Sequence, residues 1–168
     1  DYERVYPKNK IESKVETVFT GYVDENYLTQ VKILPHKERK VDVVYRARKL
    51  PYEFGKLGQL KYELATVFKR ELINTNLVYN INNTDEDIKA FLGNSWLDFL
   101  ASSRTILGSL GGAGFCDYYG EYRDRVRKYM KKNETATYEE TQKACFPEIN
   151  DNLSGMVSPR IFEAALTN

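Results

Sequence analysis

The chain has few of the residues that build metal centres and nucleophilic active sites. Its 168 residues include two cysteines, Cys116 and Cys145, and one histidine, His36. The cysteines lie far apart with no C-x-x-C spacing, so the sequence contains no zinc motif and we expect free thiols. A Ser-His-Asp or Cys-His catalytic set needs a histidine beside its nucleophile. With a single histidine and two distant thiols, the protease and hydrolase classes are excluded.

Long apolar runs and a net charge are also lacking. No run approaches the ~18 residues that a membrane span needs, and there is no signal-peptide pattern. These features predict a cytoplasmic protein. Its 25 basic and 24 acidic residues give a net charge of +1, which argues against a nucleic-acid binder. A basic run at residues 123–132 has Glu121 and Asp124 at helical spacing, which indicates a solvated helix face. A weak peripheral contact with the inner face of a membrane is the alternative.

The chain alternates between strand patterns and helix patterns, which predicts an α/β fold: a Rossmann-like parallel sheet flanked by helices. Residues 1–40 are expected to form an interdomain or linker segment, with a short strand at 15–23 and a turn followed by another strand within 24–33. Residues 41–168 are expected to form the Rossmann-like domain. Strands are predicted at 41–45, 77–81 and 105–110, and helices at 57–72, 84–100, 118–132 and 137–145 and from 158 onward.

Local capping signals support several of these helices. Thr84 with Asp87 and Thr137 with Glu140 have the spacing of a capping box. Asp117 is expected to cap the helix after it. Trp96, in the middle of the second predicted helix, is interpreted as a packing residue.

The last helix has the features of an anion site. Ser158 is expected to cap it and Pro159 suits its first position. Free N–H groups and Arg160 at a helix start favour phosphate, and Glu163, one turn on, can accept hydrogen bonds from sugar hydroxyls. The plain alternative is a helix start with a surface pair between Arg160 and Glu163.

Further candidates follow from the topology, because ligands of parallel sheets bind at the carboxyl ends of the strands. Arg46 and Arg48 follow the first strand and suit a diphosphate, although only one of them is expected to reach it. Ser109, Gly111 and Gly112 follow the third strand. The glycine turn permits close backbone approach but lacks the P-loop and G-x-G-x-x-G patterns, so a turn without a ligand is the alternative.

Several stretches resemble one family in conserved order. The string SPRIFEAA at residues 158–165, after Cys-Phe-Pro at 145–147, resembles a signature of bacterial glycosyltransferases with the two-domain GT-B fold. Further stretches are similar to parts of that family's C-terminal, nucleotide-sugar-binding domain. Residues 41–48 resemble its first strand, and residues 55–61 resemble the opening of its first helix. Trp96 with residues 102–104, followed by residues 107–113, resembles its third strand and the glycine-rich turn after it. The similarity spans about residues 40–168.

The resemblance implies a function. It suggests a hexosyltransferase-type enzyme that binds the nucleotide diphosphate of an activated sugar and transfers the sugar to a glycan or glycoconjugate acceptor in bacterial polysaccharide biosynthesis. Glu163 would hold the ribose. No cofactor and no obligatory metal are expected.

The same resemblance indicates an incomplete domain, because the chain stops directly after the motif. The expected partner is the N-terminal domain of the full-length protein, which supplies the catalytic base in many such enzymes, so no catalytic residue is assigned. An isolated fragment is expected to be inactive. The main alternative is a non-catalytic Rossmann-like interaction module that docks a partner domain. Convergence of Arg46, Gly111 and Ser158 separates the two: if these three positions do not converge, the nucleotide-binding hypothesis fails. A sugar epimerase is a weaker third option, because the dinucleotide fingerprint is missing.

Overall fold

The computed structural model describes residues 14, 16, 18, 24–83, 91, 93–149 and 155–167. The chain forms two compact units. The sheet unit comprises Thr20–Lys49, Leu60–Gly111 and Val157–Asn168, and the helical unit comprises Asp1–Phe19, Leu50–Gln59 and Gly112–Met156. The expected domain boundary near residue 40 stays a prediction.

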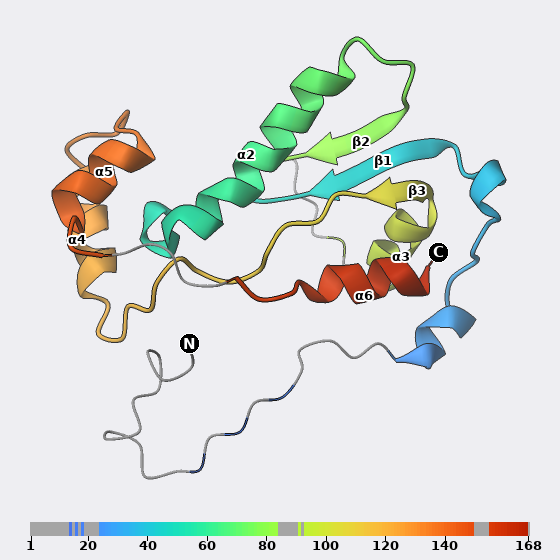
Figure 1. Ribbon diagram of the computed structural model, residues 1–168, viewed down its shortest axis with the longest axis horizontal. Helices are drawn as coiled ribbons and strands as arrows, with labels where there is room; N and C mark the ends of the chain where they lie inside the picture. The colour runs from blue at the N-terminus through green and yellow to red at the C-terminus, as the bar shows by residue number, and fades with distance from the viewer. Residues whose placement is uncertain are drawn as a thin grey trace. The chain divides into compact units, whose positions relative to one another are not determined.

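The sheet unit has an α/β architecture, as predicted. Its described strands are β1 (Val41–Arg46), β2 (Tyr79–Asn82) and β3 (Ser103–Ile106), and they form a parallel sheet in the order β2-β1-β3 (Figure 1). Val43 of β1 is in register with Tyr79 of β2 and with Thr105 of β3. Because β1 is the central strand, β2 and β3 lie on opposite sides of it. The direction in which the chain adds strands to the sheet therefore reverses between β1 and β3. In open α/β sheets ligands bind beside such a reversal, at the carboxyl ends of the strands.

Helices cover both faces of this sheet. α2 (Gly55–Leu72) runs through both units, while α3 (Asn94–Ala101) and α6 (Pro159–Leu166) belong to the sheet unit. Successive strand residues point to opposite faces. Tyr45 accordingly packs with Ala65 of α2, while Val44 packs with Phe99 of α3, and both β1 residues are fully buried. The apolar run Val43–Tyr45 of β1 is therefore explained by burial on two faces.

Some predicted boundaries in the sheet unit are wrong. β2 begins at Tyr79 rather than residue 77, and β3 ends at Ile106 rather than residue 110. The helix expected over 84–100 is seen as α3, which starts after Gly93 at a positive φ of 56°. The proposed Thr84–Asp87 capping box lies outside the described residues. Ser158 occupies the N-cap position of α6, but its side chain makes no capping bond; the first turn is closed by Ile161 N–H bonding to the Ser158 carbonyl oxygen.

In residues 24–33 the expected turn is present, but the strand expected after it is not. A 3-10 helix, Glu25–Thr29, forms the turn, and residues 30–33 form no strand. The Asp24 carboxylate accepts the Asn26 N–H at 2.9 Å, and such a local side-chain bond favours a turn over an extended strand. The other expected strand, over 15–23, lies mostly outside the described residues.

The helical unit is held by an aromatic core. It contains the 3-10 helix Tyr52–Phe54, α4 (Glu121–Met130) and α5 (Tyr138–Cys145). Phe146 is fully buried, with its ring centre 5.2 Å from that of Phe115 and 6.3 Å from that of Tyr138. The core residues of this unit are Phe115, Val126, Tyr138, Cys145 and Phe146.

The caps of the helical unit agree with the sequence. Thr137 and Glu140 form the predicted capping box, with Glu140 N–H bonding to Thr137 Oγ1 and Thr137 N–H to the Glu140 carboxylate. The Asp117 carboxylate accepts Arg123 N–H at 2.9 Å in the first turn of α4, as expected of a cap. α4 begins later than predicted because Gly120, at a φ of 74°, precedes it.

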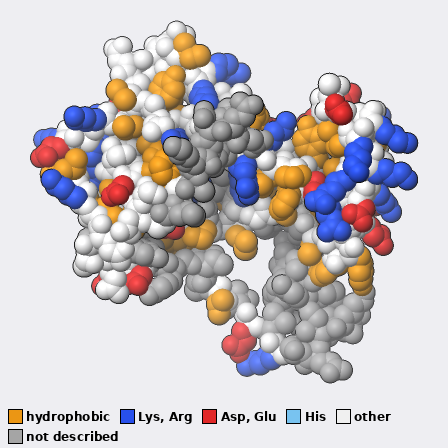
Figure 2. Space-filling model, turned by 180° about the vertical axis from the view of Figure 1, so that it is seen from behind, with side chains coloured by type: hydrophobic (Ala, Val, Ile, Leu, Met, Phe, Trp, Pro, Cys, Tyr) orange, Lys and Arg blue, Asp and Glu red, His pale blue; other side chains and the backbone are white. Residues whose placement is uncertain are grey.

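The basic run on α4 pairs differently from the prediction. Figure 2 shows Lys and Arg side chains gathered, with acidic ones among them, over the part of the molecule that contains α4. Its arginines reach Asp124, Glu148 and Glu53 instead of forming the expected pairs one helical turn apart. These pairs are partly exposed, so each contributes little to stability.

In the described part of the chain, every helix is too short or too polar to cross a membrane.

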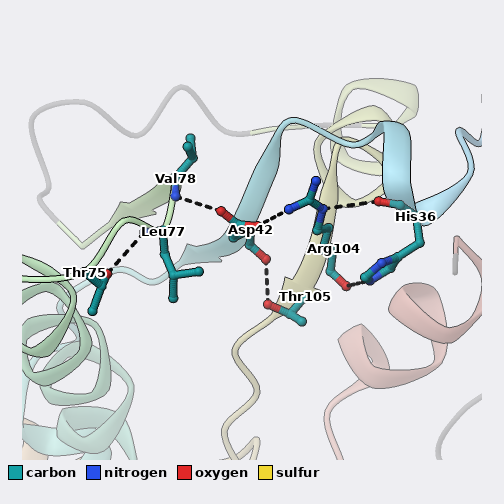
Figure 3. A network of polar contacts seen from close by, with 7 residues as sticks. All are labelled: His36, Asp42, Thr75, Leu77, Val78, Arg104 and Thr105. Atoms are coloured by element: carbon teal, nitrogen blue, oxygen red, sulfur yellow. Dashed lines mark hydrogen bonds and ion pairs between the residues drawn. The ribbon is translucent and has the colours of Figure 1, made fainter.

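A polar network joins the strands at the amino edge of the sheet (Figure 3). The Asp42 carboxylate accepts Val78 N–H at 2.8 Å and pairs with the Arg104 guanidinium at 2.5 Å. Arg104 also donates to the His36 carbonyl oxygen, and the Thr105 hydroxyl donates to the Asp42 carbonyl oxygen. One aspartate thus ties β1 to β3 and to the segment that enters β2.

The network predicts acid sensitivity of the sheet unit. The Val78 N–H bond, followed by Arg104, holds the pKa of Asp42 below its usual range. Asp42 therefore contributes stability above its unfolded pKa, ~3.9, that is lost as pH falls through its lower folded pKa. The unfolding midpoint can be followed by the fluorescence of the single tryptophan. As the pH is lowered below ~4, this midpoint should fall more steeply in the wild type than in the Asp42→Asn variant. Asp98→Asn, on the exposed side of α3, is the control. Parallel curves for wild type and Asp42→Asn would contradict the assignment.

Candidate functional site

An open pocket of about 420 Å³ lies in the sheet unit where the carboxyl end of β1 meets α3 and the start of α6. Four of its lining residues are candidates from the sequence. The residues around it are Arg46, Phe91, Trp96, Ser158, Pro159, Arg160 and Glu163.

Arg160 projects from the first turn of α6 and is held between two aromatic rings. Its guanidinium carbon lies 5.3 Å from the ring centre of Tyr45 and 5.2 Å from that of Trp96. The side chain is half-buried, and its guanidinium makes no hydrogen bond or ion pair with any residue that the structure describes. The rings hold the cation in place without using its N–H groups. The described residues therefore use none of its donors.

Glu163 lies one turn further along α6 and is oriented by Trp96. Its Oε2 accepts the indole Nε1–H of Trp96 at 2.7 Å. The surface pair between Arg160 and Glu163, which a plain helix start would favour, is not formed among the described residues. The second carboxylate oxygen is free to accept another donor at the pocket.

Arg46, the last residue of β1, is more firmly bound to the protein than Arg160. Its guanidinium donates to the carbonyl oxygens of Tyr45 and Asn80 and to the Asn80 side chain at 2.7–3.0 Å. It also lies 4.5 Å from the ring centre of Phe99. Burial lowers the pKa of Arg46. Arg46 therefore supplies a fixed positive charge at the pocket wall, with few donors left for direct ligand bonds.

The other four candidates do not line this pocket. Arg48 is exposed beyond the end of β1, which agrees with the prediction that one of the two arginines is suitably placed. Ser109 lies with its hydroxyl 3.3 Å from the Tyr45 hydroxyl. Gly111 and Gly112 are half-buried, and Gly112 has a φ of 104°, which a turn needs glycine to adopt. Of the three positions expected to converge, Arg46 and Ser158 line the pocket and Gly111 does not, so the expected convergence is met only in part.

Lys61 is a residue that the sequence did not reveal as a candidate. It is half-buried on α2, and its pKa is lowered by burial and further by the charge of Arg160. Lys61 therefore lies close enough to Arg160 for the two to repel each other. Neither Lys61 nor Arg160 has a carboxylate partner within the described residues. Such unneutralised positive charge favours an anion.

Trp96 and Phe91 were also missed as pocket residues. Trp96 was interpreted as packing, and its ring does stack on Phe99 at 5.6 Å, but its Nε1–H and its face serve Glu163 and Arg160. The sequence carries no local signal for this role, because Glu163 lies 67 positions away.

No group of three or more potential metal ligands occurs in the described ranges. Comparisons of the chain with models of protein families, with curated proteins and with solved structures find no match.

Proposed function

We propose that the sheet unit binds the diphosphate and the sugar hydroxyls of a nucleotide, as the donor-binding part of a glycosyltransferase that uses a nucleotide-activated sugar. The observation that carries the proposal is Arg160. A half-buried guanidinium that has no hydrogen-bond partner among the described residues, at the start of a helix, can bind phosphate oxygens through two parallel bonds.

The surrounding charges support a diphosphate as the ligand. Among the pocket-lining residues, Arg46 and Arg160 are cations and Glu163 is the one carboxylate. Lys61 is outside the lining, and the charge of Arg160 lowers the pKa of Lys61. The N–H groups at the start of α6 add the positive end of the helix dipole. A bound diphosphate would remove the repulsion between Lys61 and Arg160. In sugar transfer, the same groups would stabilise the charge that grows on the leaving diphosphate.

Glu163 is suited to the sugar hydroxyls of the nucleotide. Trp96 occupies Oε2 and fixes the carboxylate, so Oε1 can accept from a ribose hydroxyl. The negative charge of Glu163 disfavours a phosphate in the same position, which separates a phosphate end of the pocket at Arg160 from a hydroxyl end at Glu163.

The proposal assigns binding and charge stabilisation to this chain and no catalytic base. The acceptor, a glycan or glycoconjugate, would bind with the N-terminal domain of the full-length protein. The proposed setting is bacterial polysaccharide assembly in the cytoplasm, with weak contact at the inner membrane face.

The experiment that tests the function compares nucleotides with pyrophosphate. We expect UDP, GDP, ADP, CMP or dTDP to cause saturable shifts in the backbone amide resonances of residues 158–163. The nucleotide that binds most tightly identifies the base. Glu163→Ala should weaken nucleoside diphosphate binding by about 1–2 kcal/mol, or roughly 5- to 30-fold. The same variant should bind pyrophosphate as tightly as the wild type or more tightly, because a repelling charge is removed.

The control for this comparison is Glu63→Ala, which removes an exposed carboxylate on α2 in the same unit. This variant should bind nucleoside diphosphates and pyrophosphate with the same affinities as the wild type. An equal loss of pyrophosphate and nucleotide binding in Glu163→Ala would remove Glu163 from the hydroxyl end of the pocket. A folded wild type without shifts for any nucleotide or pyrophosphate would refute the nucleotide-binding function.

The second candidate function is the non-catalytic interaction module. It is favoured by exposed apolar side chains beside β2: Ile73, Leu77 and Val78 are 68%, 45% and 55% exposed. Apolar patches of this kind occur at docking surfaces. Absence of ligand shifts in the titration above would favour this function.

A further inference from the structure

Arg39 is a buried arginine whose partners are all backbone carbonyl oxygens. It is 4% exposed and lies just before β1 in the sheet unit. Its Nε donates to Leu34 at 3.0 Å, Nη1 to Ser103 at 2.8 Å and Nη2 to Thr167 at 2.7 Å. It pairs with no carboxylate among the residues that the structure describes. A buried charge needs compensation from its surroundings.

Backbone carbonyl oxygens supply that compensation. Ser103 is the first residue of β3, directly after the C-cap of α3, and Thr167 is the C-cap residue of α6. The carboxyl end of α6 carries a partial negative charge, which a guanidinium stabilises. Ser103 and Thr167 are each about 3% exposed, and with Arg39 they line a pocket of about 270 Å³. Arg39 therefore links the junction of α3 and β3 to the carboxyl end of α6 through one planar group.

The same two helices build the candidate pocket. α3 provides Trp96, and α6 provides Arg160 and Glu163. The Trp96–Glu163 hydrogen bond joins the helices at the pocket, and Arg39 joins the carboxyl end of α6 to Ser103, which directly follows the C-cap of α3. Thr167, whose carbonyl Arg39 binds, donates its own N–H to the Glu163 carbonyl oxygen at 3.2 Å. Arg39 is thus one helical turn from the residue that contacts Trp96.

Packing does not bury α6 completely. Phe162 and Leu166 are half-buried, and no residue of Pro159–Leu166 is fully buried. Polar contacts therefore add to the packing that positions this helix. The bond from Arg39 to the Thr167 carbonyl oxygen is one such contact, at the carboxyl end of α6.

We infer that Arg39 is a positioning residue for the anion site: by holding the junction of α3 and β3 to the carboxyl end of α6, it keeps Arg160 and Glu163 in register with Trp96. This inference rests on the proposed function for its consequence in binding. Its structural part, the effect of Arg39 on the Trp96–Glu163 contact, does not depend on any ligand.

The test uses the single tryptophan of the chain as a reporter. The indole Nε1–H of Trp96 gives one resonance in a ¹H–¹⁵N spectrum, and Glu163→Ala marks its position without the carboxylate bond. Arg39→Lys keeps the charge and the aliphatic stem but cannot reach three carbonyls with one planar fork. We expect the indole resonance of Arg39→Lys, without ligand, to move toward that of Glu163→Ala, and pyrophosphate affinity to fall at least fivefold.

Arg39→Met removes the charge as well as the planar fork, and it should move the indole resonance further than Arg39→Lys does. If Arg39→Met does not fold, the result for Arg39→Lys decides the role of Arg39. Arg70→Lys, an exposed arginine of α2 paired with Glu71, is the matched control and should leave the resonance unchanged. If Arg39 contributed to stability alone, the folded Arg39→Lys variant would have a lower unfolding midpoint but the same indole resonance and pyrophosphate affinity as the wild type. That result would overturn the inference. If the wild type binds neither pyrophosphate nor nucleotides, the proposed function fails, while the indole resonance still decides the role of Arg39.

Discussion

Arg160→Met is expected to weaken the binding of pyrophosphate and of nucleoside diphosphates by about tenfold to a hundredfold. Hydrogen bonds to charged groups contribute about 1.5–3 kcal/mol, and each 1.4 kcal/mol corresponds to tenfold in affinity. The loss should be similar for both ligands, because Arg160 is assigned to the phosphates that they share. Titration of the wild type and the variant, followed by calorimetry or by amide shifts of α6, measures it.

The structure also predicts that Arg160→Met folds normally. Arg160 makes no hydrogen bond with the described residues, so its replacement leaves no protein partner unpaired. The expected cost to stability is about 0.5–1 kcal/mol, from the lost contacts with the rings of Tyr45 and Trp96. Arg160→Lys separates charge from geometry, since lysine keeps the charge and loses the bidentate fork.

Arg70→Met is the control for the arginine variants, because it removes an exposed charge from the same unit. It should bind both ligands as the wild type does. Wild-type affinity in a folded Arg160→Met variant would show that the pocket is not the anion site.

Phe146→Ala is expected to destabilise the helical unit by about 3–5 kcal/mol, the range for removing a large buried aromatic side chain. Phe146 is fully buried, and its ring contacts those of Phe115, Tyr122 and Tyr138. Truncation leaves a cavity in the centre of this core. Because the only tryptophan lies in the sheet unit, hydrogen exchange at the backbone amide of Val126, buried in α4, is the appropriate measurement.

Tyr119→Ala provides the comparison for this prediction. Tyr119 is an aromatic residue of the same unit that is 87% exposed, so its truncation should change the opening free energy by less than about 0.5 kcal/mol. If Phe146→Ala and Tyr119→Ala protected the Val126 amide equally well, the aromatic cluster would not be the core of this unit.

Elements with strong local signals were predicted well from the sequence. The apolar β-branched run of β1, the long amphipathic pattern of α2 and the Thr137–Glu140 capping box all correspond to observed features. Predictions that depended on weaker local patterns failed at their ends. α3 begins after Gly93, and β3 stops at Ile106, because a backbone turn and the reach of the neighbouring strand decide those limits.

The candidate site divides in the same way. Arg160 and Glu163 were found because they lie beside a recognisable helix start, and Arg46 because it ends a clear strand. The glycines after β3 were equally plausible from the sequence, yet they do not line the pocket. Position after a strand is a topological property, while the lining of a pocket depends on which way each loop turns.

By itself, then, the sequence determined the strand–helix alternation, the parallel sheet and the phosphate-compatible start of α6, because these follow from residues near one another in the chain. Only the tertiary structure decided that Trp96 binds Glu163 across 67 positions and that Arg39 binds Thr167 across 128. It also brought Lys61 close enough to repel Arg160. The physical reason is that buried hydrogen bonds and unneutralised charges arise when distant segments pack together, and no short-range pattern encodes them.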